Sequence, residues 1–146
     1  MNKFTILREY ENTLIDIENV IGIRSTSNFK LKKYGKLIIG NQFRGVFSAD
    51  SNFHLRNGEM CIINTDDSKH NGTHWLSLIK FHDKIYCYDS FNRNYRKLSP
   101  YFANKKWIVA NSFIDEAYPE ANCGQRALAW LILANTYSPK IIMEII

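Results

Sequence analysis

Residues 122–134 read NCGQRALAWLILA, and this stretch decides the fold. From position 124 to position 134 the residues are strong helix formers, and the helix they form is apolar on most of its circumference. Such a helix is stable only where other elements cover it. We therefore predict a buried central helix over residues 124–134, with Cys123 immediately before its first turn.

Segments rich in β-branched and aromatic residues lie upstream and predict a sheet. The predicted strands cover residues 59–64, 74–81, 84–89 and 106–112, with a turn at 82–83. Amphipathic spacing predicts a first helix over 3–20, through Phe4, Leu7, Leu14, Ile17 and Ile21. Ser138-Pro139 is a start signal for a short last helix over 140–146.

Residues 21–57 contain four glycines and are predicted to be loop-rich, with short extended pieces. Within them, residues 42–47 are a candidate wall of a binding cleft. The order of elements predicts an α+β fold in which a central, mostly antiparallel sheet packs against the buried helix. A length of 146 residues suits a single domain, residues 1–146.

The net charge of +5 permits loose attraction to DNA or to an acidic partner. Basic residues gather at 30–36 and 93–97. They are interpreted either as a solvated face or as a non-specific contact with DNA. No stretch approaches the roughly 20 apolar residues that span a bilayer. The first twenty residues carry four acids, unlike a signal peptide, so we expect an intracellular protein without a membrane partner.

The three cysteines form no CxxC pair, so neither a disulfide framework, a zinc site nor another cofactor is expected. Cys61 and Cys87 lie in apolar runs and are predicted to be buried structural residues. Cys123 precedes a helix, where the dipole and unbonded N–H groups favour the thiolate and can hold an oxyanion. On this local context alone, a nucleophile and a structural cysteine are equally good interpretations.

A thiolate nucleophile needs a base, and the base needs an orienting group. Of the four histidines, His54, His70 and His82 lie in polar loops or a charged turn and are expected at the surface. His74 instead opens a strand. An even-length hairpin loop would put His74 and Asp89 on one face of the sheet, directly opposed or diagonal. A strand-end histidine and aspartate without a joint role stay possible at this point.

The ordered set of Gly72-Thr73-His74-Trp75, then Asp89-Ser90-Phe91, then Asn122-Cys123-Gly124 resembles the adenovirus maturation protease (adenain) family. Homologues from virophages and large DNA viruses look most similar, and SUMO-specific proteases are similar more distantly. Residues 61–65 resemble the strand before the His-Trp motif, so the resemblance covers residues 43–134. It implies an adenain-type fold with Cys123 as nucleophile, His74 as general base and Asp89 as the acid orienting the histidine.

The resemblance also implies a function. Adenain-type enzymes are cysteine endopeptidases that cleave capsid and other structural precursors during virion maturation, favour small residues at the scissile bond and are helped by DNA. It would place a monomer in the host cytoplasm or viral factory and in the virion. Two alternatives remain: an isopeptidase acting on ubiquitin-like proteins, and a catalytically weak basic binding module.

One departure from the family concerns the oxyanion. The family usually has a glutamine six or seven residues before the cysteine, where this chain has Ala117 and Glu116. An ionised carboxylate cannot donate a hydrogen bond. The Cys123 backbone N–H with the Asn122 or Gln125 amide could serve instead, or Glu116 could be kept protonated by burial. The loss of one oxyanion donor typically costs about 10²–10³ in rate.

Overall fold

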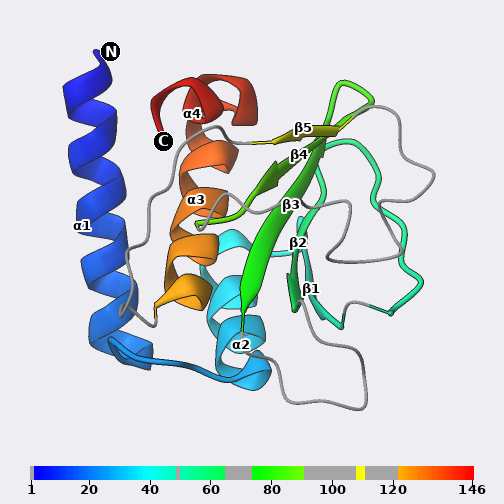
Figure 1. The fold of residues 1–146 in the computed structure, drawn as a ribbon, viewed down its shortest axis with the longest axis horizontal. Coiled ribbons are helices and arrows are strands. Elements are labelled where there is room, and N and C mark those ends of the chain that lie inside the picture. The colour runs from blue at the N-terminus through cyan, green and yellow to red at the C-terminus, as the bar shows by residue number, and fades with distance from the viewer. Residues whose placement is uncertain (1, 49, 65–73, 91–107, 111–121) are drawn as a thin grey trace.

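The computed structural model describes residues 2–48, 50–64, 74–90, 108–110 and 122–146. In these residues the chain forms four helices and five strands, and the termini of the described chain both lie on the helical side (Figure 1). In chain order the elements are α1 (Lys3–Ile21), α2 (Asn28–Ile39), β1 (Phe43–Phe47), β2 (Met60–Asn64), β3 (Trp75–Phe81), β4 (Lys84–Tyr88), β5 (Ile108–Ala110), α3 (Cys123–Tyr137) and α4 (Pro139–Ile145).

The strands form one sheet in the order β1-β2-β3-β4-β5. The two inner pairings, β2 with β3 and β3 with β4, are antiparallel, and the two outer pairings are parallel. The α+β class is confirmed, but the prediction of a mostly antiparallel sheet was wrong because the sheet is mixed. Parallel neighbours need long connections. Residues 48–59 and 89–107 are long enough to provide them, and their lengths alone did not reveal the strand direction.

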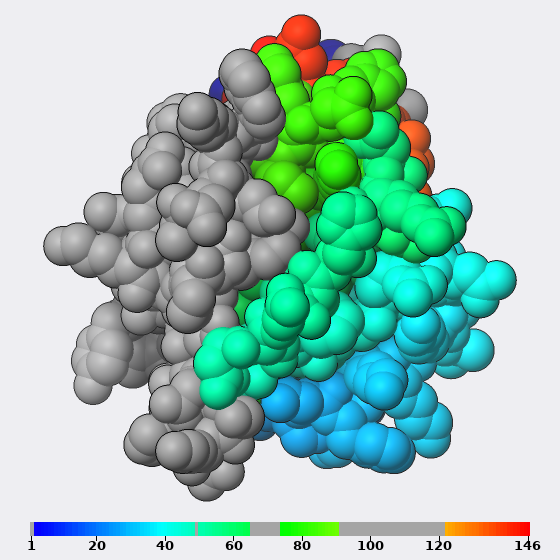
Figure 2. All heavy atoms as spheres, turned by 90° about the vertical axis from the view of Figure 1, so that its right-hand side faces the viewer, coloured from blue at the N-terminus to red at the C-terminus, as the bar shows by residue number. Residues whose placement is uncertain are grey.

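Both faces of the sheet are buried, which explains why its strands read as continuous apolar runs rather than alternating ones. One face, with Ile62, Tyr86 and Tyr88, belongs to the core shared with the helices. The other face, with Ile63 and Leu78, packs under Leu55, Phe53 and Phe47. Figure 2 looks toward this second face, where the segment leading into β2 runs beside the brighter green of β3 and β4.

Helix α3 is the central helix that the sequence predicts, and its Ala127–Leu131 stretch is fully buried. It lies against β3, where Ser77 Oγ donates a 2.6 Å hydrogen bond to the Ala127 carbonyl oxygen. The last residues of both elements, Phe81 and Tyr137, line one hollow. The helix and the strand therefore run in the same direction, as Figure 1 shows, and their first residues lie at the same end of the molecule.

Helix α1 covers α3 with a face formed by every third or fourth residue. The buried residues of this face are Ile6, Tyr10, Leu14, Ile17 and Ile21. The prediction had placed Phe4 on it, which was wrong because the phenylalanine side chain is 77% exposed. Tyr10 and Tyr88 share a 3.2 Å hydrogen bond between their hydroxyls, and this ties α1 to the sheet behind α3.

Helix α2 corrects the prediction that residues 21–57 are loop-rich. Ser27 caps its start by accepting a 3.2 Å hydrogen bond from the Lys30 backbone N–H. Within α2, only Leu31 and Gly35 are buried. So narrow an apolar face gives a weak periodic signal, and a glycine inside a helix weakens it further. Gly35 is needed because the Phe43 ring packs directly on its Cα.

A two-residue turn connects β3 to β4. His82 and Asp83 have φ angles of 49° and 64°, the left-handed conformation that a two-residue hairpin requires. The Asn57 side chain stabilises this turn through hydrogen bonds to the Asp83 carboxylate and backbone N–H, at 2.9 and 2.8 Å. The even loop length confirms the premise from which the sequence placed His74 and Asp89 on one face.

Even the longest helix, α1, is too polar to cross a bilayer, and no other helix in the described ranges is long and apolar enough either.

The contact of Gly35 with Phe43 predicts the effect of a methyl group. A Cβ at position 35 would lie 2.5 Å from the Phe43 ring, and this ring is fully buried. We expect Gly35→Ala to lower the free energy of unfolding by about 1–3 kcal/mol, measured by urea denaturation. Lys36→Ala, on the exposed side of the same helix, should change it little. A stabilised Gly35→Ala protein would contradict the packing, since alanine is otherwise the better helix former.

Candidate active site

His74 and Asp89 lie at the open end of the β3–β4 hairpin, one residue before β3 and one after β4. The register pairs Ser77 with Tyr88, so its extension sets Asp89 opposite Leu76 and diagonal to His74. The two side chains share one face and meet: His74 Nε2 lies 2.6 Å from Asp89 Oδ1. Of the two arrangements predicted from sequence, the structure has the diagonal one.

The pair is removed from water, with His74 3% and Asp89 2% exposed. A carboxylate can only accept hydrogen bonds, so the short contact requires a proton on Nε2 of the imidazole. This fixes the tautomer and leaves Nδ1 as the ring nitrogen that can exchange a proton with another group. The pair therefore has the chemistry of an oriented base.

Cys123 is the first residue of α3 and is 4% exposed. Its sulfur lies at the positive end of the helix dipole, which stabilises a thiolate. The preceding residue, Asn122, makes no capping hydrogen bond with its side chain. Its Oδ1 instead accepts a 2.9 Å hydrogen bond from Arg126 Nε. The N–H groups of the first turn are therefore not covered by the N-cap side chain.

Three contacts place the start of α3 and the start of β3 at the same end of the molecule. The helix and strand run in the same direction, so Cys123 and His74 lie at the same end. Gly124 packs against Leu31 of α2, where an added Cβ would lie 2.9 Å from Leu31 Cδ1. Asn28, at the start of α2, accepts a 2.7 Å hydrogen bond from Trp75 Nε1. The first turns of α2 thus contact the neighbours of both residues.

Gln125 does not have the role that one of the predicted alternatives gave it. Its side chain is fully buried, and its Nε2 donates to the carbonyl oxygens of Gly22 and Arg24 at 2.8 and 2.7 Å. Both amide hydrogens are therefore used inside the protein, and Gln125 cannot serve an oxyanion. It holds the α1–α2 connection against α3 instead. Glu116 and Ala117 lie outside the described residues.

Cys61, Cys87, His54 and His82 are where the sequence predicts them. Cys61 and Cys87 are buried in β2 and β4, and burial raises the pKa of both thiols. For Cys87, the nearby charge of Asp89 raises the pKa further. His54 and His82 are exposed, and His70 lies outside the described residues. Cys123 is therefore the described cysteine that has both a helix N-terminus and the His74 end of the sheet beside it.

Sequence reasoning missed the residues that position this site, Asn28 and Gln125. Asn28 Oδ1 also accepts from Asn64 Nδ2 at 3.3 Å, so it joins α2 to both β2 and β3. Its role depends on α2, which the sequence did not reveal. For Gln125, the sequence does carry a signal: an amide side chain in a buried, mostly apolar helix needs hydrogen-bond partners inside the protein. The sequence does not show which groups these partners are.

No group of three or more His, Cys, Asp or Glu side chains gathers as metal ligands among the described residues. No protein-family model and no curated protein matches this chain. The function is therefore inferred from the His74–Asp89 contact, the position of Cys123 at the start of α3 and the motif resemblance.

All three cysteines are buried, but the position of Cys123 at a helix N-terminus predicts selective alkylation. With iodoacetamide near neutral pH, Cys123 should react before Cys61 and Cys87, because burial keeps the latter two protonated. Peptide mapping by mass spectrometry measures each site, and unfolding in denaturant should make all three react alike. His74→Ala should slow Cys123 alone. Equal rates in the folded protein would contradict the assignment of Cys123 as the reactive thiol.

Proposed function

We propose that this chain is a cysteine protease in which Cys123 is the nucleophile, His74 the general base and Asp89 the acid that orients the histidine. The observation that carries the proposal is the buried 2.6 Å His74–Asp89 contact at the end of the sheet where α3 begins with Cys123. A nucleophile, a base and an orienting carboxylate are the parts that thiol-dependent acyl transfer needs.

In the proposed reaction, His74 takes the thiol proton and Cys123 Sγ forms a bond to the carbonyl carbon of the scissile peptide. The tetrahedral oxyanion collapses as the C–N bond breaks, and the imidazolium gives its proton to the leaving amine. Water then attacks the thioester with His74 again as base. The C–S bond breaks, the carboxylic acid leaves and the thiol is regenerated. Asp89 keeps the ring in one tautomer throughout.

We assign the oxyanion to the Cys123 backbone N–H and the Asn122 side-chain amide. Arg126 Nε donates to Asn122 Oδ1, so the NH₂ group is the end of that side chain that would donate to an oxyanion. Asn122 is 7% exposed, so a hydrogen bond from it acts in a region of reduced dielectric. This assignment replaces the usual family glutamine with a residue next to the nucleophile.

The substrates we propose are viral capsid and other structural precursor proteins, cleaved internally during virion maturation by an enzyme of adenain type. The motif order His74-Trp75, Asp89 and Cys123-Gly124 supports this assignment. The deep burial of Cys123 and His74 supports it too, because a slim segment with small residues at the scissile bond reaches such a site most easily. The same proposal places the protein in the infected cell and in the virion.

The test is cleavage of a proteome-derived peptide library, with fragments identified by mass spectrometry. The unaltered protein should cut with a preference for small residues at the scissile bond, and Cys123→Ala should not cut. Asp89→Asn should lower kcat/KM by about 10⁴-fold, because an amide in place of the carboxylate no longer selects the tautomer that carries its proton on Nε2. Cys61→Ala is the matched control, since it removes a buried thiol from β2 that has no electrostatic interaction with Asp89.

Two outcomes would contradict the proposal as a whole, and a third would contradict its substrate. Cleavage that survives Cys123→Ala would assign the activity to something else. Absence of cleavage together with a slow Cys123 would favour a binding module. Cleavage confined to ubiquitin-like precursors after a Gly-Gly tail would retain the triad but change the substrate to that of a deconjugating enzyme.

A further inference from the structure

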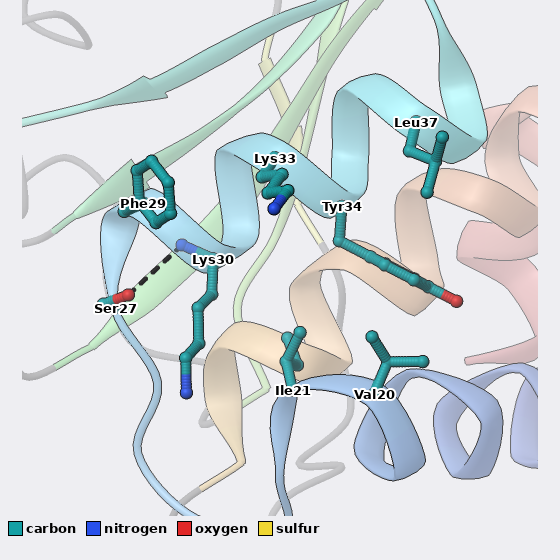
Figure 3. A pocket seen from close by; sticks show the side chains of 8 residues that line it. All are labelled: Val20, Ile21, Ser27, Phe29, Lys30, Lys33, Tyr34 and Leu37. Atoms are coloured by element: carbon teal, nitrogen blue, oxygen red, sulfur yellow. Dashed lines mark hydrogen bonds between the residues drawn. The ribbon is translucent and has the colours of Figure 1, made fainter.

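A groove of about 510 Å³ lies between the last turn of α1 and the length of α2. Figure 3 shows its walls: Val20 and Ile21 reach up from α1, and Tyr34 and Lys30 reach from α2 toward them. Phe29 and Leu37 stand near its two ends along α2. The volume is in the range of sites that accept a few side chains of a ligand. We call this hollow the α1–α2 groove.

Several large apolar side chains that line the groove are exposed to solvent. Phe29 is 72% exposed, Leu37 76% and Val20 62%. Single exposed apolar residues are ordinary, but several that converge on one hollow mark a site of interaction. These side chains contribute nothing to the packing of α2, whose buried residues are Leu31 and Gly35.

The charge around the groove is of one sign. Helix α2 contains four lysines and no acidic residue, and two of them, Lys30 and Lys33, line the groove. Lysine stems pack along apolar surface while their ammonium groups stay in water at the rim. A partner with apolar side chains and carboxylates beside them complements both the walls and the rim.

One residue, Asn28, links the groove to the neighbourhood of the candidate active site. Asn28 lies between Ser27 and Phe29, which both line the groove, and its side chain binds Trp75, the neighbour of His74.

We propose that the α1–α2 groove binds an acidic segment with apolar anchors in the polypeptide substrate, at a distance along the chain from the scissile bond. The proposal rests on the proteolytic function proposed above. A polypeptide segment fits better than the other anionic partners. A bilayer needs a flat or convex apolar face rather than a hollow between two helices. Nucleic acid brings phosphates for the lysines but no side chains for the apolar walls.

Binding can be measured without catalysis, on the Cys123→Ala protein. The probe is a fluorescein-labelled synthetic peptide with Leu and Phe one helical turn apart and Asp and Glu between them, followed by anisotropy. We expect Lys30→Glu combined with Lys33→Glu to weaken binding at least about tenfold through loss and reversal of charge. The matched control, Lys32→Glu with Lys36→Glu, changes the net charge equally on the same helix outside the groove lining. It should keep the affinity within about threefold.

The peptide controls separate the apolar walls from the charged rim. A peptide with Ser in place of Leu and Phe, and one with Lys in place of Asp and Glu, should both bind weakly. Equal losses of peptide affinity in the two double variants would overturn the proposal, because binding would then depend on the net charge of the protein and not on the groove. Binding of phosphatidylglycerol vesicles or duplex DNA in preference to the peptide, abolished by the Lys30 and Lys33 reversals, would overturn it in favour of that partner.

The link to catalysis is tested by joining this acidic peptide, through a Gly-Ser linker, to a decapeptide that the enzyme cleaves in the library assay. The extension should lower KM about tenfold at unchanged kcat in the unaltered and control proteins, and should have no effect in the Lys30 and Lys33 double variant. Peptide binding without any cleavage would refute the protease and keep the docking site. Cleavage indifferent to the extension would refute the docking site and keep the protease.

Discussion

The rest of the structure depends on the packing of α3 along β3 in the same direction. Small residues such as Ala127 let the helix approach the sheet closely, and the Ser77 hydroxyl satisfies a carbonyl oxygen at the contact. Since both elements begin at one end, the helix N-terminus with Cys123 and the strand start with His74 lie there together. If the helix ran the opposite way, the positive end of its dipole would lie beside the β3–β4 turn, away from the end of the sheet that carries His74.

The second constraint is the register of the β3–β4 hairpin. Side chains alternate between the faces of a sheet, so a slip of one residue would separate His74 from Asp89. The two-residue turn at His82 and Asp83, held by the Asn57 amide, excludes that slip. The buried pair in turn requires both partners, because removing His74 would leave the Asp89 carboxylate away from water without its hydrogen-bond donor. A turn at one end of the hairpin therefore fixes the chemistry at the other.

Much of this could be predicted from the sequence, and the failures have physical causes. The α3 helix, the hairpin and the His74–Asp89 pair follow from strong patterns: an apolar helix and a loop of even length. Helix α2 was missed because it buries only Leu31 and Gly35 and so carries little periodicity. The parallel outer strands were missed because direction is set by tertiary packing and not by strand composition. The role of Gln125 depended on where the Gly22 and Arg24 carbonyls lie, which no local pattern encodes.

The missed helix matters most for function, since α2 joins the candidate site to a basic, apolar groove. Its Asn28 contacts Trp75, and its lysines stand on the rim. The proposed protease activity, however, depends on whether the Cys123 sulfur is a thiol or a thiolate. The ultraviolet thiolate absorbance of the protein, with that of Cys123→Ala subtracted, reports this state directly across pH. Our account predicts one equivalent of thiolate near neutral pH, lost when His74 is replaced by alanine. A difference signal that appears only above about pH 8.5, the ordinary range of a free cysteine, would contradict it.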